Sequence, residues 1–211
     1  MIRLYITRHG MTSWNEQGRL QGHSDSPLTR QGEEDAIALK KVMENYPIDA
    51  VYSSPLPRAY KTASLIFPDR TIIKDERIKE MGFGVAEGQF IKVLLEDPTY
   101  DNMWNHPEKF TRFENGESYQ DVYVRLYSFL EDIKHREDEH VFIAIHGMLY
   151  VVLMSIFKCL DIKDLVTINR SIVRGGSLTI VDINEDSYSI VVEGKEDHLK
   201  KLDKQINFIK K

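Results

Sequence analysis

The apolar residues of the chain fall into two patterns, short uninterrupted runs and longer stretches in which apolar positions recur every three or four residues. A short apolar run bounded by polar or turn-forming residues is typical of a strand buried within a sheet. The last of these runs, His-Val-Phe-Ile-Ala-Ile, belongs to the most apolar strand expected in the chain. The short runs, each predicted to be a strand, are residues 2–7, 50–53, 71–74 and 140–145.

The longer stretches predict helices between these strands. Thr29 is a candidate N-cap for the first helix, and Arg58 follows a Ser-Ser-Pro-Leu-Pro turn that leads into the second. The predicted helices are residues 29–46, the second half of 54–66, 117–136 and 148–157, and residues 177–194 predict a hairpin that turns at Asn184-Glu185-Asp186. Strands that alternate with helices indicate an α/β sandwich whose crossover connections make the sheet mostly parallel.

Two segments lack a regular period. Residues 10–28 are rich in Gly, Ser, Asn, Asp and Pro, which predicts a long ordered loop, and long loops in compact domains are often functional. Residues 83–116 carry many aromatic side chains among short helical pieces, which indicates a small helical cap inserted over one end of the sheet. We therefore expect one domain over residues 1–211, with the charged tail from Lys195 as a last helix or a frayed end.

Composition narrows the function classes without naming one. The formal charge of −5 and the pI of about 5.8 leave no global basic field for nucleic acid or an anionic membrane. The single cysteine, Cys159, excludes an intramolecular disulfide, and its place near the end of an apolar stretch predicts that it is buried. No apolar run approaches membrane-spanning length, and the N-terminus lacks a signal-peptide pattern, so we expect a cytoplasmic protein.

Two predicted strands end in a histidine followed by glycine, in Arg8-His9-Gly10 and in His146-Gly147. Either histidine alone is most simply a polar residue at a strand end. In a parallel sheet, however, the carboxyl ends of neighbouring strands line one crevice, where ligands usually bind. The glycine after each histidine allows backbone or ligand to approach closely. The pair therefore predicts a shared site.

A phosphoryl group fits the cations that this topology would gather. Arg8 and Arg58 offer guanidinium forks to phosphate oxygens, and a neutral imidazole of His9 can attack phosphorus to form a phosphohistidine. Glu80, which precedes a glycine-rich turn, could protonate the leaving oxygen and later accept a proton from water. The sequence shows no P-loop, no His-Glu-x-x-His motif and no cluster of acidic residues suited to Mg²⁺, so we expect neither a metal nor a cofactor.

Five motifs, in order and spacing over nearly the whole chain, resemble the histidine phosphatase superfamily, in the branch that holds phosphoglycerate mutases and small phosphatases. They are TRHGMTSWN, GHSDSPLTRQGEEDA, YSSPLPRAYKTA, KEMGFGVAEG and IHG. The resemblance implies a three-layer α/β/α fold, with His9 as the phosphorylated nucleophile and Glu80 as the proton donor. It implies phosphate-pocket or substrate contacts from Arg8, Arg58, His146, Gly147, Asn15, Gln21 and Gly22.

The choice of branch depends on where the sequence departs from the mutases it resembles. Mutases have Glu-Ser after the Arg-His-Gly motif and a tyrosine at position 83, where this chain has Met11-Thr12 and Phe83. The cap is only lightly basic, with Lys92, Lys109 and Arg112, and Ala86 replaces a tryptophan common in the family. The ending VVEGKEDHL resembles broad-specificity phosphatases.

We therefore predict a metal-independent phosphomonoesterase that acts on a small phosphorylated metabolite. The alternative is a cofactor-dependent phosphoglycerate mutase, which would need more cations in the cap to hold a phosphoglycerate in two orientations. A third hypothesis is a catalytically silent member that only binds phosphorylated ligands. The family resemblance allows either a monomer or a homodimer.

Overall fold

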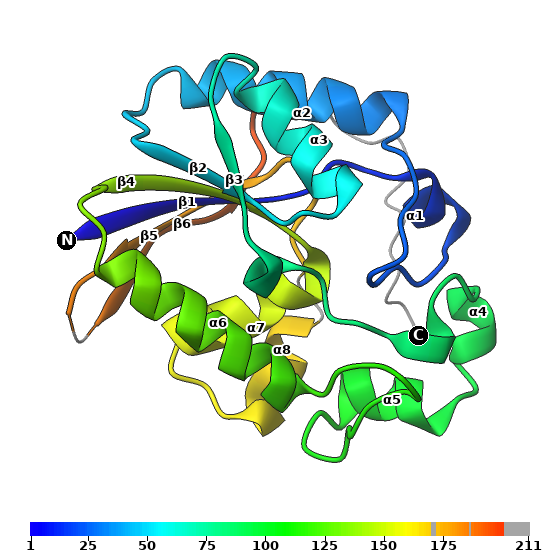
Figure 1. Ribbon diagram of the computed structural model, residues 1–211. Coiled ribbons are helices and arrows are strands. Elements are labelled where there is room, and N and C mark those ends of the chain that lie inside the picture. Colours follow the sequence, from blue (N-terminus) through cyan, green and yellow to red (C-terminus); the bar gives the residue numbers. More distant parts are fainter. Residues whose placement is uncertain (170–171, 186, 201–211) are drawn as a thin grey trace.

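The computed structural model describes residues 1–169, 172–185 and 187–200. In these residues six strands form one sheet in the order β3-β2-β4-β1-β5-β6 (Figure 1). The first four strands of the chain pair in parallel. At one side of the sheet β5 pairs antiparallel with β1, and β6 pairs antiparallel with β5. The sheet is mostly parallel, as predicted. The strands are β1 (Ile2–Arg8), β2 (Ala50–Ser53), β3 (Ile72–Lys74), β4 (His140–Ile145), β5 (Leu178–Ile183) and β6 (Tyr188–Lys195).

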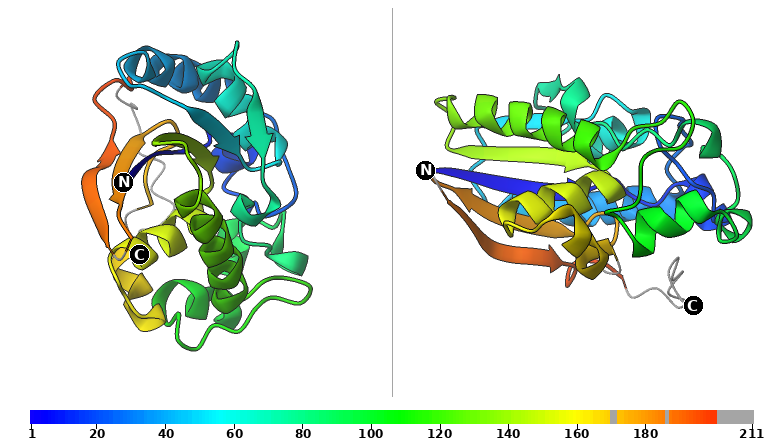
Figure 2. Two further views of the ribbon diagram at one scale, coloured as in Figure 1. Left: turned by 60° about the vertical axis from the view of Figure 1, so that its left-hand side comes forward. Right: turned by 90° about the horizontal axis from the view of Figure 1, so that it is seen from below.

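Helices cover both faces of the sheet, which confirms the three-layer α/β/α prediction (Figures 1 and 2). Helices α2 (Arg30–Met43) and α3 (Pro57–Ile66) cover one face, and α6 (Tyr119–Lys134), α7 (Gly147–Phe157) and α8 (Val166–Asn169) cover the other. Successive side chains of a strand point to opposite faces of the sheet. Tyr5 of β1 therefore packs in the core beneath α2 and α3, whereas Leu4 and Ile6 pack in the core beneath α6 and α7.

Helix boundaries follow from local chemistry. Thr29 caps α2 as predicted, because its side chain accepts a hydrogen bond from the Gly32 N–H. Every residue of α7 is buried, because α7 packs between the sheet and its neighbouring helices. Cys159, in contrast, is exposed, so the prediction that it is buried is wrong. The chain turns into the left-handed region at Cys159 (φ 53°), just beyond the end of α7, and this turn carries its side chain to the surface.

The loop at 10–28 contains one element that its composition did not predict, helix α1 (Ser13–Gln17). The segment 83–116 has the short helical pieces that were predicted, α4 (Ile91–Leu94), α5 (Pro98–Asn105) and a 3₁₀ turn at Gly84–Ala86. Both segments lie at the end of the molecule toward which the parallel strands point (Figures 1 and 2). Two further 3₁₀ turns span Glu76–Ile78 and Ile162–Leu165.

The hairpin prediction is confirmed by the antiparallel pairing of β5 and β6. The prediction for the charged tail falls largely on residues 201–211, which lie outside the described residues. None of the helices in the described part of the chain is long and apolar enough to cross a membrane.

Candidate active site

The two histidine–glycine units meet at the carboxyl ends of neighbouring strands. β1 and β4 pair in parallel with Arg8 opposite Ile145, and the His9 N–H donates to the Ile145 carbonyl at 2.9 Å. The residue directly after β4 is His146, whose ring centroid lies 5.1 Å from that of His9. The sheet topology thus brings together two residues that are far apart in the sequence.

His9 is held in one protonation state by two contacts. Its Nδ1–H donates to the Gly10 carbonyl at 2.8 Å, and the Nε–H of Arg58 donates to Nε2 at 3.3 Å. Because a guanidinium has no acceptor, Nε2 must be the unprotonated nitrogen. Burial lowers the pKa of His9 well below 6.5, and the charges of Arg58 and Arg8 lower it further. The ring is therefore neutral, with the Nε2 lone pair available to an electrophile.

Arg58 is fixed from the loop that precedes α2. It is 1% exposed, and its guanidinium donates to the Gly22 and Ser24 carbonyls at 2.7 and 3.1 Å. Asp25 accepts a further hydrogen bond at 2.8 Å and supplies the compensating negative charge. A buried guanidinium needs such a partner, because burial of an unpaired charge is costly. Arg58 thus has a fixed direction before any ligand binds.

Arg8 and His146 carry buried nitrogens without partners. Arg8 donates from Nη1 to the Val173 carbonyl at 3.1 Å, but its Nε has no hydrogen-bond partner among the described residues. Neither Nδ1 nor Nε2 of His146 has one there either, although this ring is fully buried. Buried polar groups are normally hydrogen-bonded, so the Nε–H of Arg8 and the one N–H of the neutral His146 ring are suited to donate to the oxygens of an anion.

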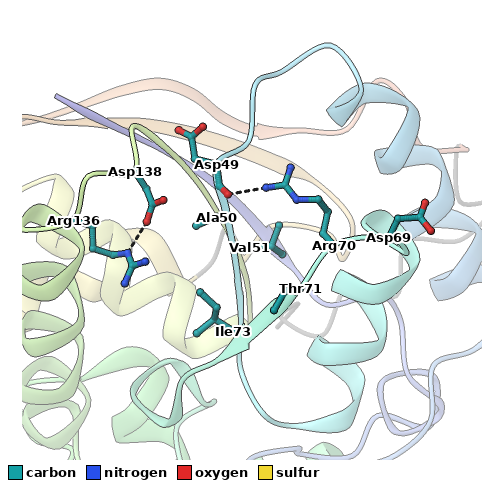
Figure 3. Close-up of a pocket in the computed structure, with 9 residues that line it drawn as sticks. All are labelled: Asp49, Ala50, Val51, Asp69, Arg70, Thr71, Ile73, Arg136 and Asp138. Carbon is teal, nitrogen blue, oxygen red and sulfur yellow. Dashed lines mark hydrogen bonds and ion pairs between the residues drawn. The ribbon is translucent and has the colours of Figure 1, made fainter.

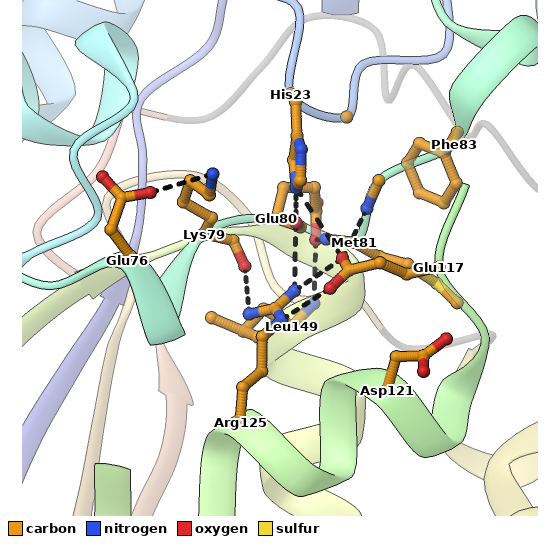
Figure 4. Close-up of polar contacts among 12 residues, drawn as sticks. His23, Glu76, Lys79, Glu80, Met81, Phe83, Glu117, Asp121, Arg125 and Leu149 are labelled. Atoms are coloured by element: carbon orange, nitrogen blue, oxygen red, sulfur yellow. Dashed lines mark hydrogen bonds and ion pairs between the residues drawn. The ribbon is translucent and has the colours of Figure 1, made fainter. Parts of the chain in front are cut away.

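Glu80 reaches the same place from the turn after β3. Its Oε1 accepts from the N–H groups of Met81 and Leu149 at 3.0 and 2.9 Å, and its Oε2 accepts from the N–H of Met148 at 3.2 Å (Figure 4). The carboxylate therefore caps the first turn of α7, where free N–H groups favour negative charge. His146 occupies the N-cap position of that helix without a capping hydrogen bond from its own side chain.

The glycines after the two histidines differ in what they require. A Cβ on Gly10 would lie 2.4 Å from the Gly32 carbonyl oxygen, so only glycine fits between β1 and the start of α2. A Cβ on Gly147 would meet the Arg8 guanidinium carbon at 3.6 Å, an ordinary contact. The prediction was that backbone or ligand approaches each glycine closely. The structure shows such an approach of protein backbone at Gly10, and no comparably close contact at Gly147 among the described residues.

The three loop residues assigned by resemblance have structural contacts of their own. Oδ1 of Asn15 accepts from the Thr12 N–H at 3.1 Å, which completes the cap of α1. Gln21 accepts from the Thr12 hydroxyl at 2.8 Å and donates to Ser26 at 3.1 Å, so it ties the loop to itself. The Gly22 carbonyl anchors Arg58. In the described structure these residues shape the loop that holds Arg58, and a direct substrate contact stays a prediction.

Two contributors were not singled out from the sequence. Asp25 fixes Arg58 from a loop in which an acidic residue gives no distinct signal. Thr62 accepts from the Gly10 N–H at 3.1 Å while its hydroxyl donates to the Arg58 carbonyl at 2.8 Å. Its spacing four residues after Arg58 places both on one face of α3, and that signal could have identified it.

A separate hollow of about 320 Å³ lies beside the first residues of β2 and β3 (Figure 3). Its arginines already have partners, since Arg70 donates to the Asp49 carbonyl at 2.7 Å and Arg136 pairs with Asp138 at 2.6 Å. It also lies at the opposite ends of the parallel strands from His9. The candidate active site is therefore the cluster at the carboxyl ends.

The cluster defines a class of site, a neutral buried histidine beside arginines whose charge suits an anion. The family model of the histidine phosphatase superfamily (branch 1) matches residues 4–195. The chain belongs to this superfamily, as its motifs predicted. No group of three or more metal-ligating side chains occurs within the part of the chain that is described.

Individual relatives include phosphatases and a mutase. A protein named as a candidate phosphoserine phosphatase 2 of Hydrogenobacter thermophilus is 31% identical over 206 residues, which are 96% of this chain and all of the relative. A "probable phosphoglycerate mutase GpmB" of Enterobacter sp. (strain 638) is 33% identical over 74% of each chain. The solved structure of Bacillus stearothermophilus YhfR is 34% identical with a TM-score of 0.87, covering 95% of this chain and all of that one. The predicted class, a phosphomonoesterase of this superfamily, is confirmed.

Proposed function

We propose that the chain hydrolyses small phosphomonoesters through a phosphohistidine on His9. The observation that carries this proposal is the fixed, unprotonated Nε2 of His9, which accepts a hydrogen bond from the buried Arg58 and follows the partly buried Arg8 in the chain. A dianionic phosphate would accept hydrogen bonds from the Nε–H of Arg8 and from the ring N–H of His146, and it would present phosphorus to Nε2 of His9. In this proposal residues 1–211 form one domain, with the segment 83–116 as its cap.

The first half of the reaction transfers the phosphoryl group. The Nε2 lone pair attacks phosphorus, the ester P–O bond breaks, and the leaving oxygen takes a proton from Glu80. Oε2 of Glu80 accepts one hydrogen bond, at 3.2 Å, whereas Oε1 accepts two shorter ones. Oε2 is therefore the oxygen that we expect to carry the proton, while α7 keeps hold of Oε1.

The second half restores the enzyme. A water molecule gives a proton to the Glu80 carboxylate and attacks the phosphorus of phosphohistidine, and the P–N bond breaks to release inorganic phosphate and neutral His9. Because Glu80 ends this half protonated, it is ready to protonate the next leaving group. None of these steps requires a metal, since Arg8 and Arg58 supply the positive charge.

The mutase alternative has support from relatives named as mutases. Two of the few cap cations are already engaged, however: Arg112 pairs with Asp121 at 3.2 Å, and the Lys92 ammonium lies 5.2 Å from the centre of the Phe90 ring. Phe83 is buried and has no hydroxyl to offer a substrate. These features favour hydrolysis over the binding of a phosphoglycerate in two orientations.

The name of the Hydrogenobacter relative makes phosphoserine the first metabolite to test. The single Cys159 is the basis for proposing a cytoplasmic location. Both monomer and homodimer are compatible with the proposal.

Phosphorus NMR can test the proposal on one mixture that contains chelator, 3-phosphoglycerate, a trace of 2,3-bisphosphoglycerate and an aryl phosphate. We expect inorganic phosphate to grow without 2-phosphoglycerate. Growth of 2-phosphoglycerate would establish the mutase instead. Mass spectrometry of enzyme quenched during turnover should find phosphate on the His9 peptide, and its absence together with absent turnover would support the silent-binder hypothesis.

A further inference from the structure

Arg125, on the face of α6 that looks toward the active site, uses every N–H of its guanidinium (Figure 4). Nη1 donates to the carbonyls of Arg77 and Lys79, each at 2.7 Å. Nη2 donates to the Glu80 carbonyl at 3.1 Å and to Glu117 at 3.0 Å, and Nε donates to Glu117 at 3.0 Å. Five donors thus meet five acceptors, a pattern that only a guanidinium can provide.

Three of these acceptors are backbone carbonyls of the turn that carries Glu80. This segment contains one short 3₁₀ helix and does not pair with a described strand, so its backbone carbonyls need hydrogen-bond donors from other parts of the chain. Arg125 supplies them from a neighbouring helix. The side chains of Ile78 and Met81 are fully buried and anchor the turn to the core, but they do not set the direction of the peptide groups between them.

Glu117 holds the other side of Glu80. Its Oε2 accepts from the Gly82 N–H at 2.8 Å, and its own N–H donates to the Gly82 carbonyl at 2.8 Å. The ring of His23 donates from Nε2 to the Glu80 carbonyl at 2.9 Å and lies 3.7 Å from Glu117. The backbone on both sides of Glu80 is therefore fixed by one connected network, which is centred on Arg125 and Glu117.

We propose that Arg125, together with Glu117, is a positioning pair that aims the Glu80 carboxyl at the leaving oxygen. The proposal rests on the proposed function, since it concerns the group named there as the general acid. Arg125 does not touch the substrate. Its effect on catalysis passes through the peptide groups of Lys79 and Glu80, and a displacement of even 1 Å in a catalytic group can cost on the order of a hundredfold in rate.

The test compares kcat/KM on two substrates that differ mainly in the leaving group, phenyl phosphate and p-nitrophenyl phosphate. The nitrophenolate leaves without help, whereas phenolate needs a proton. Arg125→Lys keeps the charge but loses the fork that serves all five acceptors. We expect kcat/KM of this variant to fall about tenfold on phenyl phosphate and less than about twofold on p-nitrophenyl phosphate.

Arg3→Lys is the matched control. Arg3 makes the same paired contact with a carboxylate, to Asp182 at 2.6 and 2.7 Å, at the opposite end of β1 from His9. It should not change the ratio between the two substrates. If Arg3→Lys shifted that ratio as much as Arg125→Lys does, the effect would be one of general stability, and the proposal would be wrong.

Glu80→Gln separates the two levels of inference. Suppose that Glu80→Gln lowers kcat/KM mainly on phenyl phosphate, while Arg125→Lys lowers kcat/KM equally on both substrates. The positioning role is then refuted, and Glu80 remains the proposed acid. If Glu80→Gln itself loses equally on both, the acid assignment fails. Should Arg125→Lys not fold, Glu117→Gln, which is similar in size, is measured on the same pair and decides in the same way.

Discussion

The burial of two neutral histidines predicts how the stability of the protein depends on acid. His9 is 3% exposed and His146 is fully buried. Burial lowers the pKa of each well below 6.5, with added repulsion from Arg58 and Arg8. In the unfolded chain both rings regain an ordinary pKa, so the unfolded state binds protons first as the pH falls. Stability conferred by these two residues is therefore present above about pH 6.5 and is lost below it.

The magnitude follows from proton linkage. Consider a histidine that stays neutral in the folded state and has a pKa near 6.5 in the unfolded state. As the pH falls from roughly 7.5 to 5.5, this residue lowers the free energy of unfolding by about 1.4 kcal/mol. The two residues together remove about 2.7 kcal/mol from the free energy of unfolding. A carboxylate with an ordinary pKa, near 4, changes its protonation little over this range.

Urea unfolding in phosphate-free buffer, at several pH values across this range, measures the effect. His146→Asn should remove about half of the pH dependence, or roughly 1.4 kcal/mol, and asparagine also suits the N-cap of α7. Ile143→Val is the control, since it destabilises the core without removing a titrating group. An unchanged pH dependence in His146→Asn would mean that this ring binds protons equally in the folded and unfolded states, and the electrostatic account of the site would be wrong.

Three further predictions concern the support of the site. Gly10→Ala should cost about 1–3 kcal/mol in urea unfolding because its Cβ would overlap the Gly32 carbonyl, whereas Gly147→Ala should fold normally; equal costs would contradict the packing account. Asp25→Asn should lower the free energy of unfolding by about 2 kcal/mol, because it removes the charge paired with buried Arg58, and an unchanged urea midpoint would show that the pair contributes nothing. Hydrolysis of p-nitrophenyl phosphate should be unaffected by prolonged dialysis against EDTA, and a loss restored by added metal would overturn the metal-independent mechanism.

Much of the site could be predicted because its residues lie next to strong local signals. Arg8, His9 and His146 follow apolar runs that can only be buried strands, and parallel strands place their carboxyl ends together. Arg58 begins a helix after a proline-rich turn, so its place near an anion site also follows from local pattern. Glu80 had no separate signal from composition or spacing; the need for a proton donor suggested it, and the motif resemblance then supported it.

Other contacts depend on which surfaces the fold brings together. Glu80 caps α7, although the two are nearly 70 residues apart, because the turn after β3 passes the start of that helix. Gln21 holds the loop through Thr12 and Ser26, a use that its sequence neighbours do not reveal. Arg125 lies on an amphipathic helix where a charged residue is ordinarily solvent-exposed.

The sequence by itself determined the layers of the fold, because hydrophobic period and strand length depend on neighbours a few residues away. It also determined the family and predicted the nucleophile, since both are encoded in short contiguous motifs. Only the tertiary structure decided the protonation of His9, the capping role of Glu80 and the network around Arg125. Each of these depends on burial and on hydrogen bonds between segments that are remote in the chain, and such contacts are fixed only when the helices pack against the sheet.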